Sequence, residues 1–417
     1  MKKKIKINKT VFVAMSGGVD SSVSAALLKK QGYDVVGVFI RTWHPEFIKC
    51  NEEEERRDAM RVVAHLNIPF LTFDLEKEYK KEVADYMIRE YKAGRTPNPD
   101  VMCNKEIKFG AFFKRAISMG ADYVATGHYA KVTPLLIKEG VGGGNSENHH
   151  PALKGTPPPQ GGDKFQLLKG VDPAKDQSYF LWTLKQAQLS KILFPIGHLN
   201  KTEVRKLAKK FKLPVAEKKD SQGICFLGAV DLKEFLKHYI KEKKGKVVDE
   251  NGDEIGYHNG VVFYTLGERH GFTITQKSPN DKPYYVVGKD TKRNTITVSQ
   301  FPIPPFNKLR VPRDSRDNSQ FPNNFQISNV IKIKDTNWIS SFSPKAYGLE
   351  PRAYSCQIRY HGEFLPCKIK NISKTKAEGP ERSRRAEVIF QKPILVASGQ
   401  SCVFYDKDIC LGGGVVE

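Results

Sequence analysis

Short apolar runs alternate with amphipathic stretches through the first half of the chain, and this alternation restricts the folds that the chain can adopt. The apolar runs have the length of buried strands and occupy residues 11–15, 34–40, 70–75 and 123–128. Helical patterns occupy residues 22–30, 54–66, 77–92 and 105–119. Strands that are apolar throughout are buried on both faces, and helices cover those faces. We therefore expect a doubly wound parallel α/β sheet whose ligand lies beyond the carboxyl ends of the strands.

A change of pattern beyond about Gly245 indicates a different architecture in the second half. The last helical patterns are residues 178–184, 201–211 (capped by Thr202 or Asn200) and 232–239, and short strands such as 284–288 and 295–298 follow. These strands predict a small β-rich domain and a terminal β-barrel. A chain of 417 residues is long for one core, and the expected domains are an α/β domain at 1–228, a small central domain at 229–288 and a β-barrel domain at 289–417. Polar insertions are expected at about 136–163, which we interpret as disordered, and at 312–324 and 374–385.

The overall charge favours a polyanionic partner. The formal net charge is +22, which is typical of proteins that bind nucleic acid, although a solvated lysine surface gives the same count. No apolar run approaches the roughly 20 residues that a membrane span needs. The basic start leads directly into the first strand without the apolar core of a signal peptide. We therefore expect a cytoplasmic protein that makes no contact with a membrane.

A phosphate-binding loop is predicted where the first strand meets the first helix. The segment Ser16-Gly17-Gly18-Val19-Asp20-Ser21-Ser22 offers two glycines, several hydroxyl donors and the amides of a helix N-terminus, where anions are favoured. Its carboxylate, Asp20, suits a bridging Mg²⁺. The segment lacks the lysine of a P-loop NTPase and the spacing of a dinucleotide-binding GxGxxG, so both of those classes are disfavoured. An ordinary glycine-rich turn is the structural alternative.

Cysteine usage points to chemistry rather than to structural cross-links. The chain has seven cysteines without a CxxC pair or a short-spaced Cys/His cluster, which disfavours a disulfide framework and a zinc site. Cys103 and Cys225 lie in turn-forming segments 122 positions apart (225 − 103). Because Cys103 immediately precedes a predicted helix, we expect the helix dipole and the nearby Lys105 to lower its pKa. A nucleotide loop with two loop-borne thiols indicates ATP-driven sulfur chemistry.

Several longer motifs carry a family resemblance. Residues 96–109, with the sequence TPNPDVMCNKEIKF, resemble the first-cysteine signature of the tRNA-specific 2-thiouridylases, which belong to the ATP pyrophosphatase (PP-loop) family. Residues 220–226, with the sequence DSQGICF, resemble the second-cysteine loop of that family. Shorter matches are residues 16–21, 126–130, 175–181, 358–360 and 398–401. The resemblance spans almost the whole chain apart from the insertions.

The resemblance implies 2-thiolation of the wobble uridine of tRNA, with ATP and Mg²⁺ as cofactors. Adenylation of the uracil O2 would turn a poor leaving group into a good one. Cys225 would carry sulfur as a persulfide, which Cys103 would attack, either releasing hydrosulfide or thiolating the base directly. A Cys103–Cys225 disulfide would remain, and a thiol reductant would reset it. The other implied partners are tRNAs with Lys, Glu or Gln anticodons and a cysteine desulfurase or sulfur-relay protein, and we expect a monomer.

The same resemblance implies roles for individual residues. Asp100 is implied to act with the two cysteines, as an acid/base or as an orienting group. The residues implied to bind the nucleotide are Ala14, Met15, Ser16, Gly17, Gly18, Val19, Asp20, Ser21, Ile40 and Gly127. The residues implied to contact tRNA are Asn98, Pro99, Asp100, Lys175, Asp176, Gln177, Arg359 and Tyr360. Two further site residues are implied, His128 beside the ATP and Gln400 in the barrel.

Structural alternatives exist for several of these residues. Asp100 suits a simple Asn-Pro-Asp turn, Asp176 a helix cap, His128 a structural position and Tyr360 a barrel core. Two other functions also stay open: a PP-loop ligase or amidating enzyme that needs neither thiols nor tRNA, and a tRNA-binding or redox-responsive protein without catalysis. A disulfide requires Cα atoms within about 7 Å, so a wider separation of the two cysteines would require the Cys225 loop to move.

Overall fold

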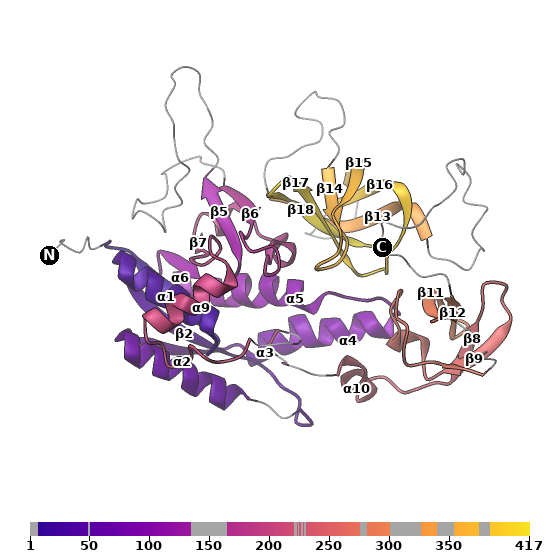
Figure 1. Cartoon of the computed structure of the whole chain (residues 1–417), viewed down its shortest axis with the longest axis horizontal. Coiled ribbons are helices and arrows are strands. Elements are labelled where there is room, and N and C mark those ends of the chain that lie inside the picture. The colour runs from indigo at the N-terminus through magenta and orange to yellow at the C-terminus, as the bar shows by residue number, and fades with distance from the viewer. Residues whose placement is uncertain are drawn as a thin grey trace, which may run out of the picture.

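A computed structural model of the chain is shown in Figure 1. The described residues are 7–48, 51–134, 165–220, 223, 225–226, 228, 231–275, 282–300, 327–339, 354–374 and 384–417. The expected insertions at 136–163 and 312–324 lie outside the described residues, as does most of the expected insertion at 374–385.

A five-stranded parallel sheet forms the centre of the N-terminal domain. Its strand order is β3-β2-β1-β4-β7, and every neighbouring pair is parallel. The strands are β1 (Thr10–Met15), β2 (Asp34–Arg41), β3 (Phe70–Asp74), β4 (Tyr123–Ala125) and β7 (Ile192–Leu193). β4 ends three residues before the expected His128, because the chain leaves the sheet there to enter β5 (Ala130–Pro134). The parallel α/β class predicted from the alternation of patterns is confirmed.

Alternate side chains of β1 belong to two apolar layers, as expected for a sheet covered on both faces. Val11 and Val13 pack with residues of α1 (Val19–Gln31), α2 (Glu52–Leu66) and α9 (Lys201–Lys210). Phe12, between them in sequence, packs in a second cluster with residues of two longer helices. The first of these helices consists of α3 (Glu76–Tyr79), η1 (Lys80–Ala84) and α4 (Asp85–Lys92). The second consists of α5 (Pro99–Met102), η2 (Cys103–Phe112) and α6 (Phe113–Ser118).

Both helices of the second layer contain a π-helical segment, η1 in the first and η2 in the second. The second helix begins at Pro99 rather than at the expected Lys105. Asn98 caps it, because its side-chain oxygen accepts a 3.2 Å hydrogen bond from the amide of Val101, and proline suits the first helical position. The expectation that Cys103 immediately precedes a helix is therefore wrong, since Cys103 lies in the second turn.

Short helices complete the α/β domain and lead out of it. Residues 178–184, expected as one helix, form the 3₁₀ helix η3 (Ser178–Leu181). α9 begins after Asn200 rather than after Thr202, and the amide of Asn200 donates a 2.8 Å hydrogen bond to the carboxylate of Glu203. Further short helices in the described part of the chain are α8 (Gln186–Leu189), α10 (Leu232–Lys237) and η4 (Val261–Phe263). Within the described residues, no helix is both long and apolar enough to cross a membrane.

The central domain is a second five-stranded sheet with the order β10-β9-β8-β12-β11. Its strands are β8 (Gly245–Val248), β9 (Glu254–His258), β10 (Thr273–Ile274), β11 (Tyr285–Asp290) and β12 (Thr295–Ser299). β12 pairs with β8 on one side and with β11 on the other. A domain boundary after residue 288 would cut β11 and separate β12 from its partners, so we propose that the central domain extends to about residue 300.

The C-terminal domain is a six-stranded barrel, which confirms the predicted β-barrel. Its strands are β13 (Ile327–Trp338), β14 (Tyr354–Gln357), β15 (Leu365–Lys374), β16 (Arg384–Leu395), β17 (Ser401–Asp406) and β18 (Ile409–Val416). Pairing of β13 with β18 closes it. The hairpin of β5 and β6 (Phe165–Lys169) joins this sheet, because Leu167 pairs with Cys410 of β18. The α/β domain and the barrel are thereby connected through backbone hydrogen bonds.

Candidate active site

The structure brings Cys103 and Cys225 into contact. Their Sγ atoms lie 3.3 Å apart with the Cys103 thiol as the donor, and both cysteines are free. A disulfide bond is about 2.05 Å long, so oxidation of this pair to a disulfide would require only a short movement of the sulfurs. The wide separation that would have required a large movement of the Cys225 loop is not observed.

The pKa values of the two thiols are shifted in opposite directions. Cys103 is fully buried, and burial together with its hydrogen bond to Cys225 raises its pKa well above the usual value. The hydrogen bond from Cys103 lowers the pKa of Cys225, and the charge of Lys108 lowers it too, whereas burial acts to raise it. The expectation of a lowered pKa at Cys103 is therefore wrong. Its expected helper, Lys105, is exposed and pairs instead with Glu106 at 2.8 Å.

Contacts from three other segments hold the backbone at Cys225. The Asp100 carboxylate accepts a 2.9 Å hydrogen bond from the Cys225 amide, and the Tyr79 hydroxyl donates one of 2.7 Å to the Cys225 carbonyl. A ring nitrogen of His44 lies 2.8 Å from the carbonyl oxygen of Phe226. The backbone of Phe226 has φ +67°, which is uncommon for a bulky residue and typical of strained functional loops.

Asp100 therefore has a partner in the thiol site and is not a simple turn residue. It lies in the first turn of α5, next to Pro99 and the capping Asn98. Burial raises the pKa of the Asp100 carboxyl, although the Cys225 amide and the charge of Lys108 act to lower it. A carboxyl with a raised pKa exchanges protons more readily near neutral pH. This position suits both of the roles expected for Asp100.

Lys108 is a residue of this site that the sequence reasoning missed. Its Nζ lies 5.7 Å from the centre of the Phe226 ring and 3.5 Å from Nε2 of His128. Burial would lower the pKa of Lys108, but the nearby Cys225 and Cys103 sulfurs raise it overall. Lys108 follows Cys103 by five positions, and the i, i+5 hydrogen bonding of η2 brings such residues toward each other. The usual i, i+4 helix period does not reveal this neighbour.

His128 is buried behind Lys108. Its Nδ1 lies 2.6 Å from the Thr126 hydroxyl oxygen, while Nε2 faces the Lys108 ammonium group. Burial, with the Lys108 charge, lowers the pKa of His128 well below its usual value, so the ring is neutral. A neutral ring can accept from Lys108 at Nε2 and donate to Thr126 at Nδ1. His128 thus fixes the position of Lys108.

The predicted phosphate loop has the geometry of an anion site. The loop joins β1 to α1, whose first residue follows Gly18, and no side chain caps the helix there. Gly17 has φ +67°, which glycine tolerates. A Cβ on Gly127 would lie 2.7 Å from the amide nitrogen of Ser21, so the lack of a side chain at Gly127 lets the chain pack directly against the loop. Ala14 and Met15 precede the loop in β1, and Ile40 lies near the carboxyl end of the neighbouring β2.

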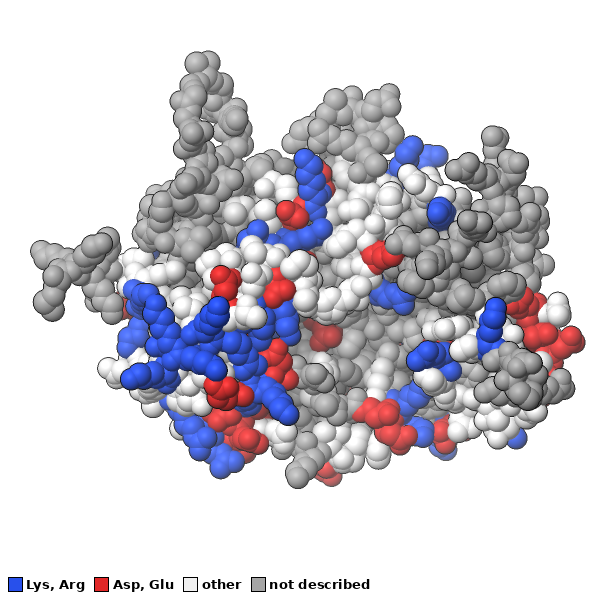
Figure 2. Space-filling model, in the orientation of Figure 1, with Lys and Arg blue, Asp and Glu red and all other residues white. Residues whose placement is uncertain are grey.

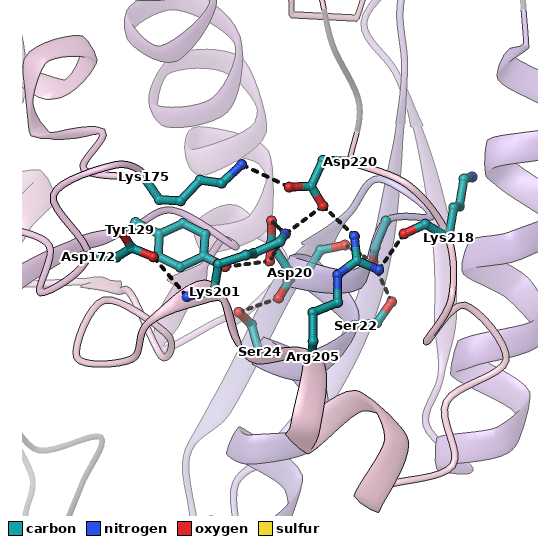
Figure 3. A network of polar contacts seen from close by, with 12 residues as sticks. Asp20, Ser22, Ser24, Tyr129, Asp172, Lys175, Lys201, Arg205, Lys218 and Asp220 are labelled. Atoms are coloured by element: carbon teal, nitrogen blue, oxygen red, sulfur yellow. Dashed lines mark hydrogen bonds and ion pairs between the residues drawn. The ribbon is translucent and has the colours of Figure 1, made fainter. Parts of the chain in front are cut away.

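A cluster of charged side chains adjoins this loop (Figure 3). The Lys201 ammonium group contacts both carboxylate oxygens of Asp20, at 2.8 and 2.9 Å, and the Tyr129 hydroxyl donates to Asp20 at 2.7 Å. Lys201 also contacts Asp220 at 2.8 Å. Arg205 and Lys175 complete the cluster on Asp220. Lys201, Arg205 and Asp220 were not predicted as site residues, because no local pattern joins segments that are far apart in the sequence.

Several of the residues expected to contact tRNA are bound to other residues of the chain. Lys175 pairs with Asp220 at 2.8 Å. The side chain of Gln177 accepts a hydrogen bond from the Tyr129 amide. The Asp176 carboxylate accepts from the amides of Gly170 and Ser178, but the N-cap of η3 is Gln177, so the helix-cap alternative for Asp176 is not observed. These contacts order the segment rather than leave its side chains in solvent.

A cavity of about 460 Å³ lies where the 175–177 segment meets the barrel. Asp176 and Tyr360 both line it, together with Lys131 and Lys169. Tyr360 packs against Phe180 with ring centres 4.4 Å apart, so it lies at the seam between domains rather than in the barrel core. The neighbouring Arg359 is exposed.

Gln400 connects the barrel to the segment that precedes Cys103. Its side-chain amide donates a 2.9 Å hydrogen bond to the carbonyl of Thr96, and the Thr96 amide donates to the carbonyl of Ser398 at 2.8 Å. Thr96 also contacts Thr265 of the central domain through their hydroxyl groups, 3.2 Å apart. All three domains therefore meet at the residue that introduces the first-cysteine signature.

Comparisons with known proteins cover nearly the whole chain. Residues 9–229 match a family model described as a tRNA methyl transferase HUP domain, residues 233–300 a tRNA methyl transferase PRC-barrel domain, and residues 328–416 an aminomethyltransferase beta-barrel domain. The chain is 42% identical to the tRNA-specific 2-thiouridylase MnmA of Geobacillus thermodenitrificans (strain NG80-2) and 41% identical to that of Listeria monocytogenes serotype 4b (strain CLIP80459). Each match covers 98% of this chain and 94% of the relative.

Among solved structures, the chain is similar to a 4-thiouridine synthetase in complex with RNA and bound ATP. That match has 18% identity and a TM-score of 0.31, and it covers 55% of this chain and 50% of the other. A likeness of this size carries no argument about the site.

Proposed function

Because the chain belongs to the family of tRNA-specific 2-thiouridylases, we propose that it is a tRNA-uridine 2-sulfurtransferase acting on the wobble uridine. The observation that carries the proposal is the 3.3 Å contact between the sulfurs of Cys103 and Cys225, because a transfer that ends in a disulfide needs two thiols within reach. A ligase without thiol chemistry gives this contact no role, whereas a tRNA-binding or redox-responsive protein without catalysis could use the thiol pair but leaves the phosphate loop without one.

ATP is the proposed activating cofactor, held by the loop Ser16–Ser21 with Ala14, Met15, Ile40 and Gly127. The start of α1, which no side chain caps, supports this assignment. ATP supplies AMP to the uracil O2, with loss of pyrophosphate. Among the described residues, no group of three or more His, Cys, Asp or Glu side chains is suited to a metal. Mg²⁺ would therefore be held by Asp20 together with phosphate oxygens.

Sulfur transfer would begin at Cys225, whose lowered pKa favours the thiolate that attacks a donor persulfide. Cys225 then carries the transferred sulfur as a persulfide. The Cys103 thiolate attacks the inner sulfur of that persulfide, and the outer sulfur leaves as hydrosulfide or goes directly to C2 of the activated uracil. AMP leaves from C2, and a Cys103–Cys225 disulfide forms. A thiol reductant returns two electrons to regenerate both thiols.

Proton movements in this scheme fall to Asp100 and Lys108. Cys103 must lose its proton before it attacks, and the Asp100 carboxyl with its raised pKa is a suitable acceptor beside the pair. Lys108 supplies a positive charge that favours thiolate formation. His128 accepts from Lys108 and so acts as a positioning residue.

The proposed tRNA surface comprises the 98–100 and 175–177 segments and Arg359-Tyr360. The cavity between Asp176 and Tyr360 offers an aromatic face and two lysines, Lys131 and Lys169, which suits an unstacked nucleotide. Lys and Arg side chains also gather on the face shown in Figure 2, over the region where Figure 1 places α1 and α9. With a net charge of +22, this surface supports binding of a polyanion. The proposed tRNAs are those with Lys, Glu and Gln anticodons.

Reconstitution with ATP, Mg²⁺, a tRNA transcript, cysteine, a cysteine desulfurase and a thiol reductant tests the proposal. We expect 2-thiouridine at the wobble position by mass spectrometry of the digested tRNA. Cys225→Ser and Cys103→Ser should each abolish it, whereas Cys367→Ala in β15 should not. Full activity of Cys225→Ser would contradict the mechanism. ATP turnover that needs neither tRNA nor the two cysteines would favour the ligase alternative.

A further inference from the structure

Three cationic side chains converge on a single carboxylate beside the phosphate loop (Figure 3). Lys175 Nζ lies 2.8 Å from Oδ2 of Asp220, while Lys201 Nζ and Arg205 Nη2 lie 2.8 and 2.5 Å from Oδ1. Lys201 and Arg205 lie one turn apart in α9, and Lys175 comes from the segment before η3. Cations from separate elements gathered on one small anion form the arrangement that proteins use for phosphate.

The cation cluster is in contact with the first turn of α1. The ammonium group of Lys201 reaches Asp20, the second residue of that helix, as well as Asp220. The backbone of Gly127 packs against the same turn, because a Cβ there would lie 2.7 Å from the Ser21 amide nitrogen and 3.1 Å from the Cβ of Asp20. The cations and the amides of the loop therefore lie on adjacent sides of one small region.

The ion pairs of the cluster join three cations, Lys175, Lys201 and Arg205, to two carboxylates, Asp20 and Asp220. A third carboxylate, Asp172, accepts a 2.9 Å hydrogen bond from the backbone amide of Lys201 rather than from a cation. Burial would raise the pKa of Asp220, but hydrogen bonds from Lys175 and Lys201 hold it well below the usual value, so Asp220 is ionised. The side chains of Asp220 and Lys175 are 30% and 38% exposed, which leaves them reachable by a soluble anion.

We propose that Lys175, Lys201 and Arg205 form a binding site for the β- and γ-phosphates of ATP and for the departing pyrophosphate, and that Asp220 occupies this site as an internal anion. Phosphate oxygens, with more charge and more acceptors than one carboxylate, displace Asp220 from the cations. The inference deepens the proposed function and rests on it for the identity of the nucleotide. None of these four residues belongs to the loop or to the set expected to bind ATP, and Lys175 would serve the phosphates as well as the tRNA surface to which its segment is assigned.

A purely structural network is the competing explanation. Arg205 also donates a 3.1 Å hydrogen bond to the carbonyl of Ala216 and contacts that of Lys218, so it supports the chain after α9. In that case Asp220 would only help to hold the segment in place. The two explanations predict different effects on phosphate binding when Asp220 is replaced. Removal of an internal competitor strengthens phosphate binding, whereas removal of a structural anchor weakens it or leaves it unchanged.

Calorimetric titration of the full chain with inorganic pyrophosphate, with and without Mg²⁺, separates them. We expect Asp220→Asn to bind pyrophosphate at least about tenfold more tightly than the unchanged protein, since fewer charge-assisted contacts are lost on binding. Lys201→Met and Lys175→Met should each bind about tenfold more weakly or worse. The matched controls are Glu217→Gln and Lys209→Met, which remove an exposed ion pair of 3.0 Å on the same helix and the following segment.

Unchanged or weaker binding by Asp220→Asn would overturn the inference, as would unchanged binding by both lysine variants. Circular dichroism and melting temperature establish that each variant is folded. If Asp220→Asn fails to fold, Lys175→Met decides, because Lys175 has the most exposed side chain of the three cations. The titration requires neither tRNA nor sulfur. If the unchanged protein thiolates tRNA but the variants bind pyrophosphate as it does, this inference alone is wrong. If the unchanged protein binds pyrophosphate but does not thiolate tRNA, the proposed function is wrong.

Discussion

The hydroxyl of Tyr79 donates a 2.7 Å hydrogen bond to the carbonyl oxygen of Cys225, so a fully buried side chain at the end of α3 holds the backbone of this cysteine. The Tyr79 ring also meets Phe226 edge-on, with ring centres 6.0 Å apart. Phe226 has a positive φ, which these outside contacts help to maintain. The position of the Cys225 sulfur thus depends on the helix layer of the α/β domain.

Replacement of Tyr79 by Phe should loosen the thiol pair. The change removes one hydrogen bond worth about 1 kcal/mol and keeps the ring contact with Phe226. We expect slower formation of the Cys103–Cys225 disulfide under a mild oxidant, measured by mass spectrometry of trapped thiols. Tyr86→Phe, in the following α4, is the control and should oxidise at the original rate. Equal rates for all three proteins would show that Tyr79 does not position Cys225.

Lys108→Met should raise the pKa of Cys225 by removing a positive charge that favours its thiolate. On its own, Cys103→Ala should raise the pKa of Cys225 by more than Lys108→Met does, because the hydrogen bond from Cys103 is the larger cause of the lowered pKa. Both variants should therefore alkylate more slowly at Cys225 near pH 7. Iodoacetamide labelling as a function of pH, read out on the Cys225 peptide, measures this. The control, Lys105→Met, removes an exposed charge from the same helix and should not shift the pH profile of labelling. If Lys108→Met also leaves this profile unchanged, Lys108 does not favour the Cys225 thiolate.

Sequence patterns predicted the sheet and both thiols because these depend on local signals. Apolar strand runs and the Ser16–Ser21 turn are read within a few residues, and each cysteine belongs to a long motif. Lys108 was missed because its approach to Cys103 requires the π-helical geometry of η2, and the periodicity of apolar residues in the sequence does not indicate a π-helix. The same geometry explains the error at Cys103, since a helix that already begins at Pro99 buries this thiol and raises its pKa.

The cation cluster shows a second limit of sequence reasoning. Asp20 pairs in the structure with Lys201, which lies 181 positions away in the sequence. Charge pairs of this kind depend on where α9 packs, and α9 packs by its apolar face through Val204 and Ala208. The pattern therefore predicts the helix but not the partner of its polar side chains. Gln400 is similar, because its contact with Thr96 joins residues 304 positions apart.

His128 should make the stability of the protein depend on pH. Its pKa in the folded state lies well below the ordinary value of 6.5, so the folded protein holds it neutral while the unfolded chain takes up a proton. The stability contributed by neutral His128 is present above pH 6.5 and is lost as the pH falls below that value, by at most about 1.4 kcal/mol per pH unit. His128→Gln keeps an acceptor for Lys108 but cannot titrate, so its free energy of unfolding should fall less between pH 6.5 and 5. The exposed His65, changed to Gln, is the control; an identical pH slope in His128→Gln and the unchanged protein would contradict the assignment.

Gly399→Ala tests whether the barrel positions the segment that leads to Cys103. Gly399 has φ +93°, and a Cβ there would lie 2.8 Å from the carbonyl oxygen of Thr96. Gly252 has nearly the same backbone angle, φ +95°, but a Cβ at that position would have no neighbour within 4 Å. Both alanine variants carry the backbone strain of about 1–3 kcal/mol, so any difference between them reports the contact with Thr96.

We expect Gly399→Ala to lower the melting temperature more than Gly252→Ala does. It should also reduce the rate of thiolation at saturating tRNA, because displacement of Thr96 shifts Asn98, Asp100 and Cys103 relative to Cys225. Gly252→Ala should retain the rate of the unchanged protein, since β8 and β9, which flank Gly252, belong to the central sheet. If the two variants lose stability and rate equally, the contact between the barrel and Thr96 is a packing contact without influence on the thiols.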